Sequence, residues 1–303
     1  MRVLVVGATG LLGTELVRLL ENRYETLGWS RRAPIPAPAF RSRIETVDIT
    51  DPDAVFNKLG RWEPQVVIHS AAMSDVDACE RDPVAALAVN AGGTANVAQA
   101  CAANGAVLIA VSTDYVFDGS LERPYREEDA TNPISVYGRS KLEGERRALE
   151  LVPRCVLVRV SGIFGPARQN FVSSSAQKLR AGQPVPVVTE QRYSPSYSVD
   201  LAAGIEALTK QLERDPQAAR QGGPLYGPLH LTNEGGASRL EVARCVAECI
   251  GVSDPQIQQV TWEALQRPAR RPRNSVLDCD RFRRVSGAPL RTWKEAVRAF
   301  LEQ

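Results

Sequence analysis

Short apolar runs alternate with longer amphipathic stretches through the first half of the chain. The runs are rich in β-branched residues, which is typical of buried strands, and the stretches between them repeat apolar residues at helical spacing. We predict strands over Arg2–Val6, Glu25–Trp29, Ile44–Val47, Gln65–His69, Val107–Val111 and Cys155–Val160, and helices over Leu11–Leu20, Asp51–Leu59, Pro83–Asn104 and Ser135–Leu151. This alternation predicts an α/β fold with a doubly wound parallel sheet of the Rossmann type.

The pattern changes after Val160, where glycine, proline and serine become frequent. Helices are predicted over Asp200–Leu212, Ser238–Ile250 and Thr292–Glu302, and a strand over Leu229–Thr232. We therefore expect a dinucleotide-binding domain over residues 1–160, rejoined by part of 195–225, and a smaller substrate-binding lobe over most of 161–303. The proline-rich segment Ala33–Pro38 is expected to form an extended surface connection.

The composition excludes several functional classes. Among 303 residues, 37 Lys and Arg nearly balance 35 Asp and Glu, which argues against a nucleic-acid-binding protein. No apolar run approaches the roughly 20 residues that cross a bilayer, and we expect no signal segment. The six cysteines form no CxxC pair and the chain has only two histidines. We therefore expect no metal site, and a reduced, cytoplasmic protein.

A glycine-rich segment follows the first predicted strand and opens the first predicted helix. It reads Gly7-Ala8-Thr9-Gly10-Leu11-Leu12-Gly13. In such a segment the first glycine permits a tight turn, the second lets the backbone approach a pyrophosphate, and the third allows close packing of helix and strand. The amino terminus of the helix offers N–H groups to an anion. The segment therefore predicts a dinucleotide site formed by Gly7, Thr9, Gly10, Leu11, Leu12 and Gly13.

The end of the second strand indicates which dinucleotide binds. It reads Ser30-Arg31-Arg32, with no carboxylate to accept hydrogen bonds from the ribose of NAD. A hydroxyl and two guanidinium groups suit a 2′-phosphate, so we favour NADPH, with NADH as the open alternative. In that alternative, Arg31 and Arg32 are a solvated basic pair.

Two further strand ends complete the expected cofactor site. Asp48 and Ile49 follow the third strand and are expected to bind and cover the adenine. The small residues Ser70-Ala71-Ala72 follow the fourth strand and leave room for the middle section of the cofactor. His69, which ends that strand, is interpreted as a structural histidine rather than a catalytic one.

A tyrosine and a lysine begin the helix predicted over Ser135–Leu151. Tyr137 and Lys141 lie one turn apart on the same face. A nearby ammonium lowers the pKa of a phenol, so the pair can exchange a proton with an alcohol oxygen while hydride moves at the adjacent carbon. Hydroxyls at the end of the fifth strand, Thr113 first and Ser112 second, are placed to bind the substrate carbonyl. For Tyr115 two roles remain as alternatives, packing against neighbouring side chains and stacking on the sugar of the substrate.

With these motifs the chain resembles the extended short-chain dehydrogenases/reductases, and more narrowly the dTDP-4-dehydrorhamnose reductase family. The likeness covers nearly the whole chain, and the order and spacing of its motifs are specific. It is carried by Gly7–Gly13, Val47–Asp51, Ala71–Asp77, Ser112–Gly119, Pro124–Asp129, Asn132-Pro133, Tyr137–Lys141, Gly144-Glu145, Asn170–Val172 and Arg271–Asp278.

The resemblance implies a reaction and the residues for it. Thr113, Tyr137 and Lys141 take the positions of the family's catalytic triad, and Lys141 also holds the nicotinamide ribose. The implied reaction is hydride transfer from NAD(P)H to C4 of a dTDP-4-keto-6-deoxyhexose, with Tyr137 protonating the new alkoxide. The product is dTDP-L-rhamnose or a relative. Candidate substrate-binding residues are Ser112, Asp114, Tyr115, Asn170, Phe171 and Arg271.

The chain departs from the family pattern at two positions. Gly162 stands where many members have a tryptophan after the sixth strand, and Tyr193 replaces a glycine in a later motif. The identity of the hexose in the substrate is therefore left open, and a 4-reductase for another nucleotide deoxysugar is an alternative. A second alternative is a non-catalytic NADP-binding regulatory subunit, similar to the β subunit of methionine adenosyltransferase. A homodimer is a further expectation.

Overall fold

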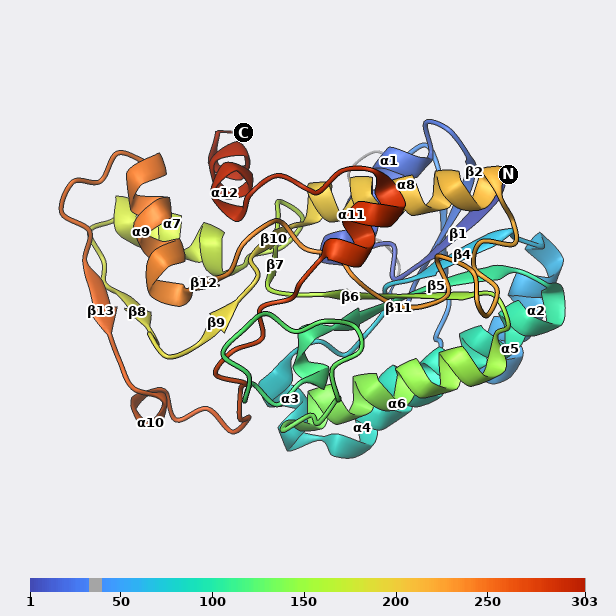
Figure 1. The fold of residues 1–303 in the computed structure, drawn as a ribbon, viewed down its shortest axis with the longest axis horizontal. Helices are drawn as coiled ribbons and strands as arrows, with labels where there is room; N and C mark the ends of the chain where they lie inside the picture. The colour runs from blue at the N-terminus through green and yellow to red at the C-terminus, as the bar shows by residue number, and fades with distance from the viewer. Residues whose placement is uncertain (33–39, 303) are drawn as a thin grey trace.

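A seven-stranded parallel sheet forms the centre of the protein, in a computed structural model that describes residues 1–32 and 40–302 (Figure 1). The strand order is β11-β6-β5-β4-β1-β2-β3. The strands are β1 (Arg2–Val6), β2 (Glu25–Ser30), β3 (Arg43–Thr46), β4 (Val66–His69), β5 (Val107–Thr113), β6 (Cys155–Val160) and β11 (Gly227–His230). The order reverses between β1 and β4, and in such sheets ligands bind at the carboxyl ends of the strands beside this switch point. The predicted doubly wound fold is confirmed.

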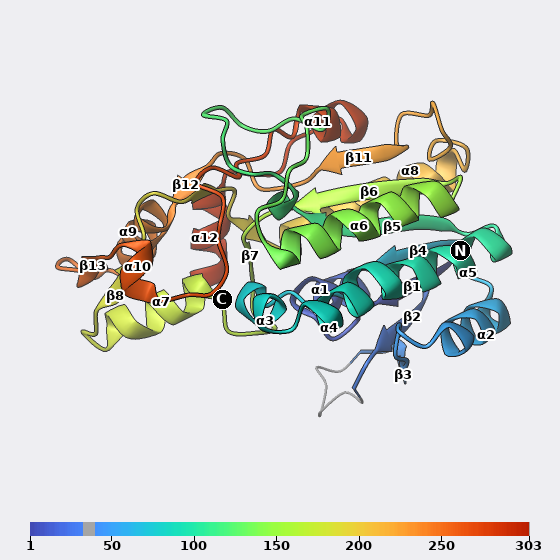
Figure 2. The ribbon, with the colours of Figure 1, turned by 90° about the horizontal axis from the view of Figure 1, so that it is seen from below.

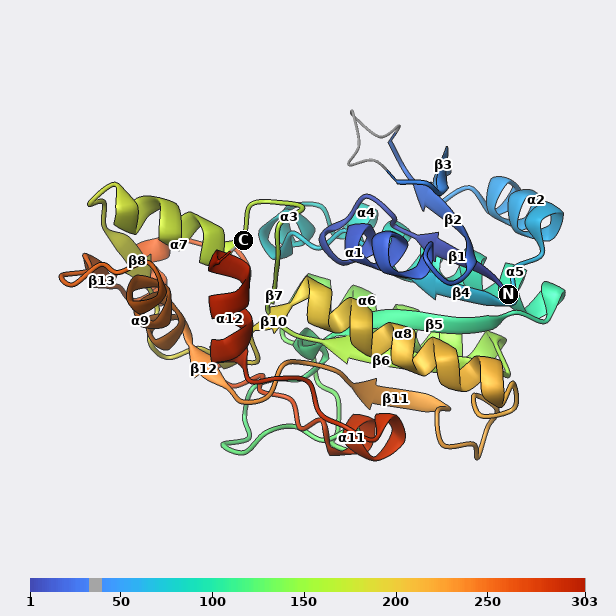
Figure 3. The same cartoon turned by 90° about the horizontal axis from the view of Figure 1, so that it is seen from above.

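Helices cover both faces of the sheet, as Figures 2 and 3 show from opposite sides. One face carries α1 (Leu11–Leu20), α8 (Ser198–Arg214) and α11 (Asp280–Ser286), and the other carries α2 (Pro52–Trp62), α5 (Thr94–Asn104) and α6 (Val136–Leu151). Side chains alternate along the strands. Val3 and Val5 of β1 join the core beneath α1 and α8, whereas Leu4 and Val6 join the core beneath α2 and α5.

Side-chain caps fix where the helices next to the sheet begin. Asp51 accepts a hydrogen bond from the Ala54 N–H, and Pro52 occupies the first turn of α2. Ser135 accepts a hydrogen bond from the Gly138 N–H at the start of α6. These are the positions where the sequence predicts the helices to begin.

The single helix predicted over Pro83–Asn104 is wrong in detail, because α4 (Pro83–Leu87) and α5 are separated by a π-helical turn over Ala88–Gly93. Asn90 in this turn binds the backbone of Met73 through both amide atoms, at 2.8 and 3.1 Å. A Cβ on Gly93 would lie 2.6 Å from the Ile49 side chain. The turn thus brings the Asn90 amide to the connection between β4 and α3 (Val76–Arg81) and lets Ile49 approach. The preceding helix α3 was not predicted.

A smaller lobe lies beyond the carboxyl ends of the strands, at the left of Figure 1. Its core is formed by α7 (Phe171–Arg180), α9 (Arg239–Cys249) and α12 (Trp293–Leu301). Short strands pair within it or beside it: β7 (Ile163–Phe164) with β10 (Ser196–Tyr197), β8 (Val185–Val187) with β13 (Ile257–Gln259), and β9 (Arg192–Tyr193) with β12 (Ala237–Ser238). The helix α10 (Trp262–Leu265) follows β13.

The chain crosses between the two layers more than once. It leaves the sheet after β6, returns as α8 against α1, and adds β11 beside β6. The domain boundary near residue 160 stays a prediction. The predicted connection Ala33–Pro38 lies outside the described residues. Within the described part of the chain, no helix has the length and apolar character needed to span a bilayer.

Candidate active site

The glycine segment after β1 has the backbone geometry that its spacing predicts. Gly7 adopts φ +90°, and a Cβ there would lie 2.6 Å from the Ala71 nitrogen. A Cβ on Gly13 would lie 2.0 Å from the Gly7 carbonyl oxygen. Gly10 is the N-cap residue of α1 and has no side chain that could bind the free N–H groups of the helix. The first turn of α1 also carries no acidic residue. These features leave a backbone cradle at a helix amino terminus, which fits a dinucleotide pyrophosphate.

The other predicted cofactor residues surround this cradle. The Ser30 and Thr9 hydroxyl oxygens lie 2.7 Å apart, which joins the end of β2 to the glycine segment. Arg31 and Arg32 are exposed, and neither forms an ion pair with a described acid. Their guanidinium groups are therefore available to an anion at the end of β2. Ser70 donates to the Val6 carbonyl at 2.9 Å.

Asp48 and Ile49 lie at the end of β3. Asp48 accepts hydrogen bonds from the Thr50 N–H and hydroxyl at 2.9 and 2.8 Å, and the backbone bond holds its pKa below the ordinary value. Ile49 is buried against Gly93. Ala71 and Ala72, which follow β4, are half-buried. The structure thus places these residues along one edge of the sheet, and their part in cofactor binding stays a prediction.

Thr113, Tyr137 and Lys141 meet at the carboxyl end of β5. Tyr137 lies in the first turn of α6, and the Thr113 hydroxyl hydrogen-bonds its phenol. The rings of Tyr137 and Tyr115 meet edge to face, with centroids 5.8 Å apart. One turn further along α6, the Lys141 ammonium donates to the Val111 carbonyl at 2.9 Å. Two elements thus bring together the three groups that the sequence predicts to be catalytic.

Burial sets the protonation of this trio. It raises the pKa of Tyr137 and lowers that of Lys141 to about 8. The expectation that Lys141 lowers the Tyr137 pKa is wrong for this structure, because the ammonium binds the Val111 carbonyl and desolvation of the phenol dominates. Tyr137 therefore keeps its proton at neutral pH, which suits a proton donor.

Asp114 connects the trio to the rest of the molecule. Its buried carboxylate accepts hydrogen bonds from Thr113 at 3.0 Å, Ser161 at 2.7 Å and Ser275 at 2.5 Å. Burial raises its pKa to about 6 against these hydrogen bonds. The Thr113 hydroxyl donates to Asp114 and accepts from the Tyr115 N–H at 3.2 Å, so one lone pair remains to accept the Tyr137 proton. Asp114 was predicted to bind substrate, but here its carboxylate faces hydroxyls of the chain itself.

Ser112 lies on the opposite face of β5 from Thr113. Its buried hydroxyl has no partner among the described residues, and it lines a cavity of about 10 Å³ with His69, Lys141 and Glu145. A cavity of this size is at the lower limit for holding one water molecule. His69 contacts the Thr94 hydroxyl at 3.0 Å, and burial together with the Lys141 charge lowers its pKa to about 3. His69 is therefore neutral.

The remaining predicted substrate residues lie in the lobe or face it. Tyr115 accepts a hydrogen bond from the Gln191 amide at 3.3 Å. Asn170 caps α7, and its amide donates to the backbone of Gly165 and Arg168 at 2.7 and 2.9 Å, so the side chain has a structural role. Its part in substrate binding, like that of the half-buried Phe171, stays a prediction.

Arg271 is held by an acid of the sheet domain. Its guanidinium donates to Asp77 of α3 at 2.7 Å and to the Ala269 carbonyl at 2.9 Å. Arg267 also contacts Asp77, at 3.8 Å. The segment after α10 is thereby tied to α3, and the Arg271 charge is already balanced.

Besides Arg271, a second arginine, Arg239, lies among the predicted substrate residues, and it was not predicted from the sequence. The Cζ atom of Arg239 lies over the rings of both Phe171 and Tyr193, 4.5 Å from each centroid. Arg239 is the first residue of α9, in an ordinary capping sequence that carries no ligand-binding motif. The arrangement depends on residues from α7, β9 and α9, so no local sequence signal could have identified it.

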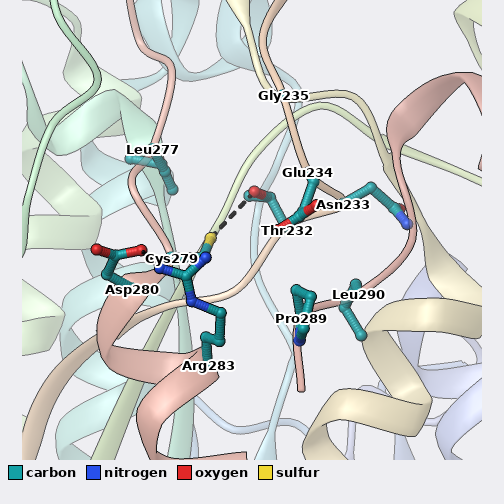
Figure 4. Close-up of a pocket in the computed structure, with 10 residues that line it drawn as sticks. All are labelled: Thr232, Asn233, Glu234, Gly235, Leu277, Cys279, Asp280, Arg283, Pro289 and Leu290. Carbon is teal, nitrogen blue, oxygen red and sulfur yellow. Dashed lines mark hydrogen bonds and ion pairs between the residues drawn. The ribbon is translucent and has the colours of Figure 1, made fainter. Parts of the chain in front are cut away.

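A separate cavity of about 270 Å³ lies beyond the carboxyl end of β11 (Figure 4). Cys279 and Thr232 lie 3.2 Å apart in its wall, and Arg283 pairs with Asp280 at its rim. None of the predicted catalytic or cofactor residues lines it. Among the described residues, no cluster of His, Cys, Asp and Glu could hold a metal ion.

Comparison with known proteins gives full-length matches. The family model described as the RmlD substrate binding domain matches residues 1–303. A dTDP-4-dehydrorhamnose reductase of Streptomyces griseus is 38% identical over 98% of this chain and 91% of its own length. A probable dTDP-4,6-dihydroxy-2-methyloxan-3-one 4-ketoreductase of Streptomyces antibioticus is 34% identical over 98% of this chain and 94% of its own.

A solved structure shows the same fold over the full length. It is the dTDP-4-dehydrorhamnose reductase of Bacillus anthracis in complex with NADP, which superimposes with a TM-score of 0.86 and is 29% identical. The match covers 99% of this chain and 98% of that one. The smaller lobe and the sheet domain are therefore both represented in this relative.

Proposed function

The chain belongs to the RmlD family of sugar-nucleotide 4-ketoreductases, and from that premise we propose that it reduces dTDP-4-dehydro-L-rhamnose to dTDP-L-rhamnose with NADPH. The observation that carries the proposal is the meeting of Thr113, Tyr137 and Lys141 at the sheet edge that also carries the glycine cradle. The Streptomyces griseus relative with this activity in its name supports the choice of sugar.

The residues at the β5 end have distinct tasks in this reaction. Tyr137 is neutral and donates its proton to the oxygen at C4, which becomes an alkoxide as the carbon is reduced. The Thr113 hydroxyl, whose proton is held by Asp114, orients the phenol. Lys141 lies one helical turn from the phenol with its ammonium on the Val111 carbonyl at 2.9 Å, and we assign it to the nicotinamide ribose. When bound, the reduced nicotinamide supplies the hydride.

Preference for NADPH rests on the end of β2. Ser30 contacts Thr9 of the glycine segment, and the exposed Arg31 and Arg32 follow directly. This set offers a hydroxyl and charge-assisted donors to a 2′-phosphate. The Bacillus anthracis relative was solved with NADP, which supports the same choice.

A second candidate is a 4-ketoreductase for another dTDP-deoxysugar. Its support is the contact between Gly162 and Tyr193, the two positions at which the chain departs from its family's pattern. A Cβ on Gly162 would lie 2.3 Å from the Tyr193 ring, so the tyrosine ring fits only because position 162 has no side chain. The Streptomyces antibioticus relative, with a different 4-ketoreductase activity in its name, shows that the family accommodates other sugars. The intact catalytic trio speaks against the non-catalytic regulatory subunit.

The proposal is tested by adding a panel of 4-keto nucleotide sugars and following NADPH oxidation. We expect the highest kcat/KM with dTDP-4-dehydro-L-rhamnose. Tyr137→Phe removes the proton donor and should lower kcat by about 10²-fold or more without changing the Kd for NADPH. Tyr226→Phe, a half-buried tyrosine before β11, is the matched control and should retain full activity.

Two outcomes would contradict the proposal at different levels. Oxidation that is fastest with another 4-keto sugar would overturn the choice of hexose and support the second candidate. Turnover of Tyr137→Phe within threefold of the unchanged protein would remove Tyr137 from the mechanism.

A further inference from the structure

Arg239 is a cation in an aromatic clamp, which we define as Arg239 with Phe171 and Tyr193. The two rings lie 4.5 Å from its Cζ atom and come from α7 and β9, whereas Arg239 itself begins α9. Cation–π contact with two rings favours the charged, ordered side chain. The N–H groups of the guanidinium are the part of this side chain that can bind a hydrogen-bonding partner.

No described acid balances this charge. The nearby Arg192 is paired with Glu241, and Arg271 with Asp77, at 3.2 and 2.7 Å. Arg239 forms no ion pair with any residue of 1–32 or 40–302, although it is half-buried. The positive charge of Arg239 is therefore available to an anionic ligand.

The clamp is held rigidly from both sides. Tyr193 is 3% exposed and packs directly on Gly162, whose φ of +49° and missing Cβ make room for the ring. Phe171 follows Asn170, which is fixed to the Gly165 carbonyl at 2.7 Å. An arginine that is already ordered loses little conformational entropy when it binds a ligand.

The clamp lies close to the catalytic trio. Gln191, two residues before Tyr193 of the clamp, donates its amide to the Tyr115 hydroxyl at 3.3 Å. The Tyr115 ring in turn meets Tyr137 edge to face at 5.8 Å. The segment that carries Tyr193 is therefore connected to the phenol through Gln191 and Tyr115. In a nucleotide sugar, C1 carries the diphosphate and C4 lies across the hexose ring, so the diphosphate site must lie near the proton donor but apart from it.

We propose that Arg239, held between Phe171 and Tyr193, binds the diphosphate of the nucleotide-sugar substrate and thereby places C4 at Tyr137. The inference rests on the proposed function, since it assigns a part of the same substrate. Bidentate hydrogen bonding from a planar guanidinium suits phosphate oxygens. Arg271, the arginine favoured from the sequence, keeps its charge balanced by Asp77 and acts as a tie between the lobes.

The experiment measures dTDP and thymidine binding by titration calorimetry with the full chain. Arg239→Ala should weaken dTDP binding by about 10- to 100-fold, the range expected for loss of charged hydrogen bonds, and should leave the Kd for NADPH unchanged. Thymidine, which has no phosphate, should bind both proteins equally. Arg239→Lys keeps the charge without the planar edge and should give an intermediate loss.

Arg244→Ala is the matched control, because Arg244 is exposed on the same helix and its removal changes net charge equally. It should bind dTDP as the unchanged protein does. A loss of dTDP affinity under twofold in Arg239→Ala, or an equal loss for thymidine, would overturn the inference while leaving the proposed function in place. Failure of the unchanged protein to bind dTDP would overturn both.

Discussion

Tyr137 and Thr113 form a hydrogen-bonded pair whose direction follows from the neighbouring carboxylate. Thr113 donates to Asp114, so it accepts from the phenol, and burial keeps the phenolic proton in place. The spacing of Tyr137 and Lys141 and the strand end before Thr113 were enough to predict that the three meet. The sequence could not show that Lys141 binds a backbone carbonyl, because that contact depends on how deeply α6 packs against β5.

Arg31 and Arg32 provide a residue-scale test of cofactor choice. Both are exposed at the end of β2 and are not paired with a described acid, so the double substitution to Ala removes free donors without breaking an ion pair. We expect the KM for NADPH to rise by about 10- to 100-fold and the KM for NADH to change less than about twofold.

The control for that test is Arg61→Ala, an exposed arginine at the end of α2. Its KM values for both cofactors should stay unchanged. Equal increases for NADPH and NADH in the double variant would show that the two guanidinium groups do not bind a 2′-phosphate.

At the scale of elements, α6 and the π-helical turn pack too closely for a side chain between them. A Cβ on Gly144 would lie 2.4 Å from the Asn90 carbonyl oxygen. Gly144→Ala should therefore lower the free energy of unfolding by about 1–3 kcal/mol, the cost of overpacking. The clash also disturbs Asn90, whose amide donates to Ser140 beside Lys141 at 2.9 Å, so activity should fall as well.

Urea unfolding and turnover measure both effects, with Gly60→Ala as the matched variant. Gly60 lies inside α2, where a Cβ would come no nearer than 3.7 Å to Asn104. This change should raise the free energy of unfolding by about 0.5–1 kcal/mol, because alanine favours the helix. Equal stability of Gly144→Ala and Gly60→Ala would contradict the packing argument.

Element prediction succeeded where burial imposes a pattern and failed where pairing is long-range. The strands β1, β4, β5 and β6 are mostly continuous apolar runs, and the sequence shows them directly. The strands of the lobe are two or three residues long and pair distant segments, as Arg192–Tyr193 does with Ala237–Ser238. Such short segments cannot show the alternation of apolar and polar residues by which a strand is recognised in a sequence. In α7, the run Ser173-Ser174-Ser175 hides the helical pattern that its buried face shows in the structure.

For the whole molecule, two buried histidines make stability depend on pH. Burial lowers the pKa of His69 and of His230 from 6.5 to about 3, so the unfolded chain binds protons between these values that the folded chain does not. The contribution of the two neutral histidines to the free energy of unfolding is therefore fully present above pH 6.5, and it is lost as the pH falls toward 3. Asp114, whose pKa is raised from 3.8 to about 6, binds a proton in the folded chain between these pH values and so stabilises the fold on acidification. This gain offsets the loss from only one of the two histidines.

Thermal unfolding between pH 7 and pH 4 measures this balance. We expect a net loss of about 1.4 kcal/mol per pH unit below pH 6, seen as a falling Tm. His230→Gln keeps a donor toward the Tyr125 and Asp278 carbonyls, which lie 3.1 Å from Nδ1, and should make the decline shallower. A Tm that stays constant or rises on acidification would contradict the assignment of neutral histidines.

Asp114 carries a consequence for how such enzymes diversify. Its carboxylate binds one hydroxyl from the end of β5, one from the segment after β6 and one from Ser275, which belongs to the C-terminal part of the chain. The Asp114 carboxylate therefore does two things: it fixes the lobe through Ser275, and it holds the Thr113 hydroxyl that orients the phenol of Tyr137. A chimera that grafted a foreign sugar-recognition lobe onto this sheet would inherit a correctly aimed Thr113 only if the graft brought a hydroxyl to position 275.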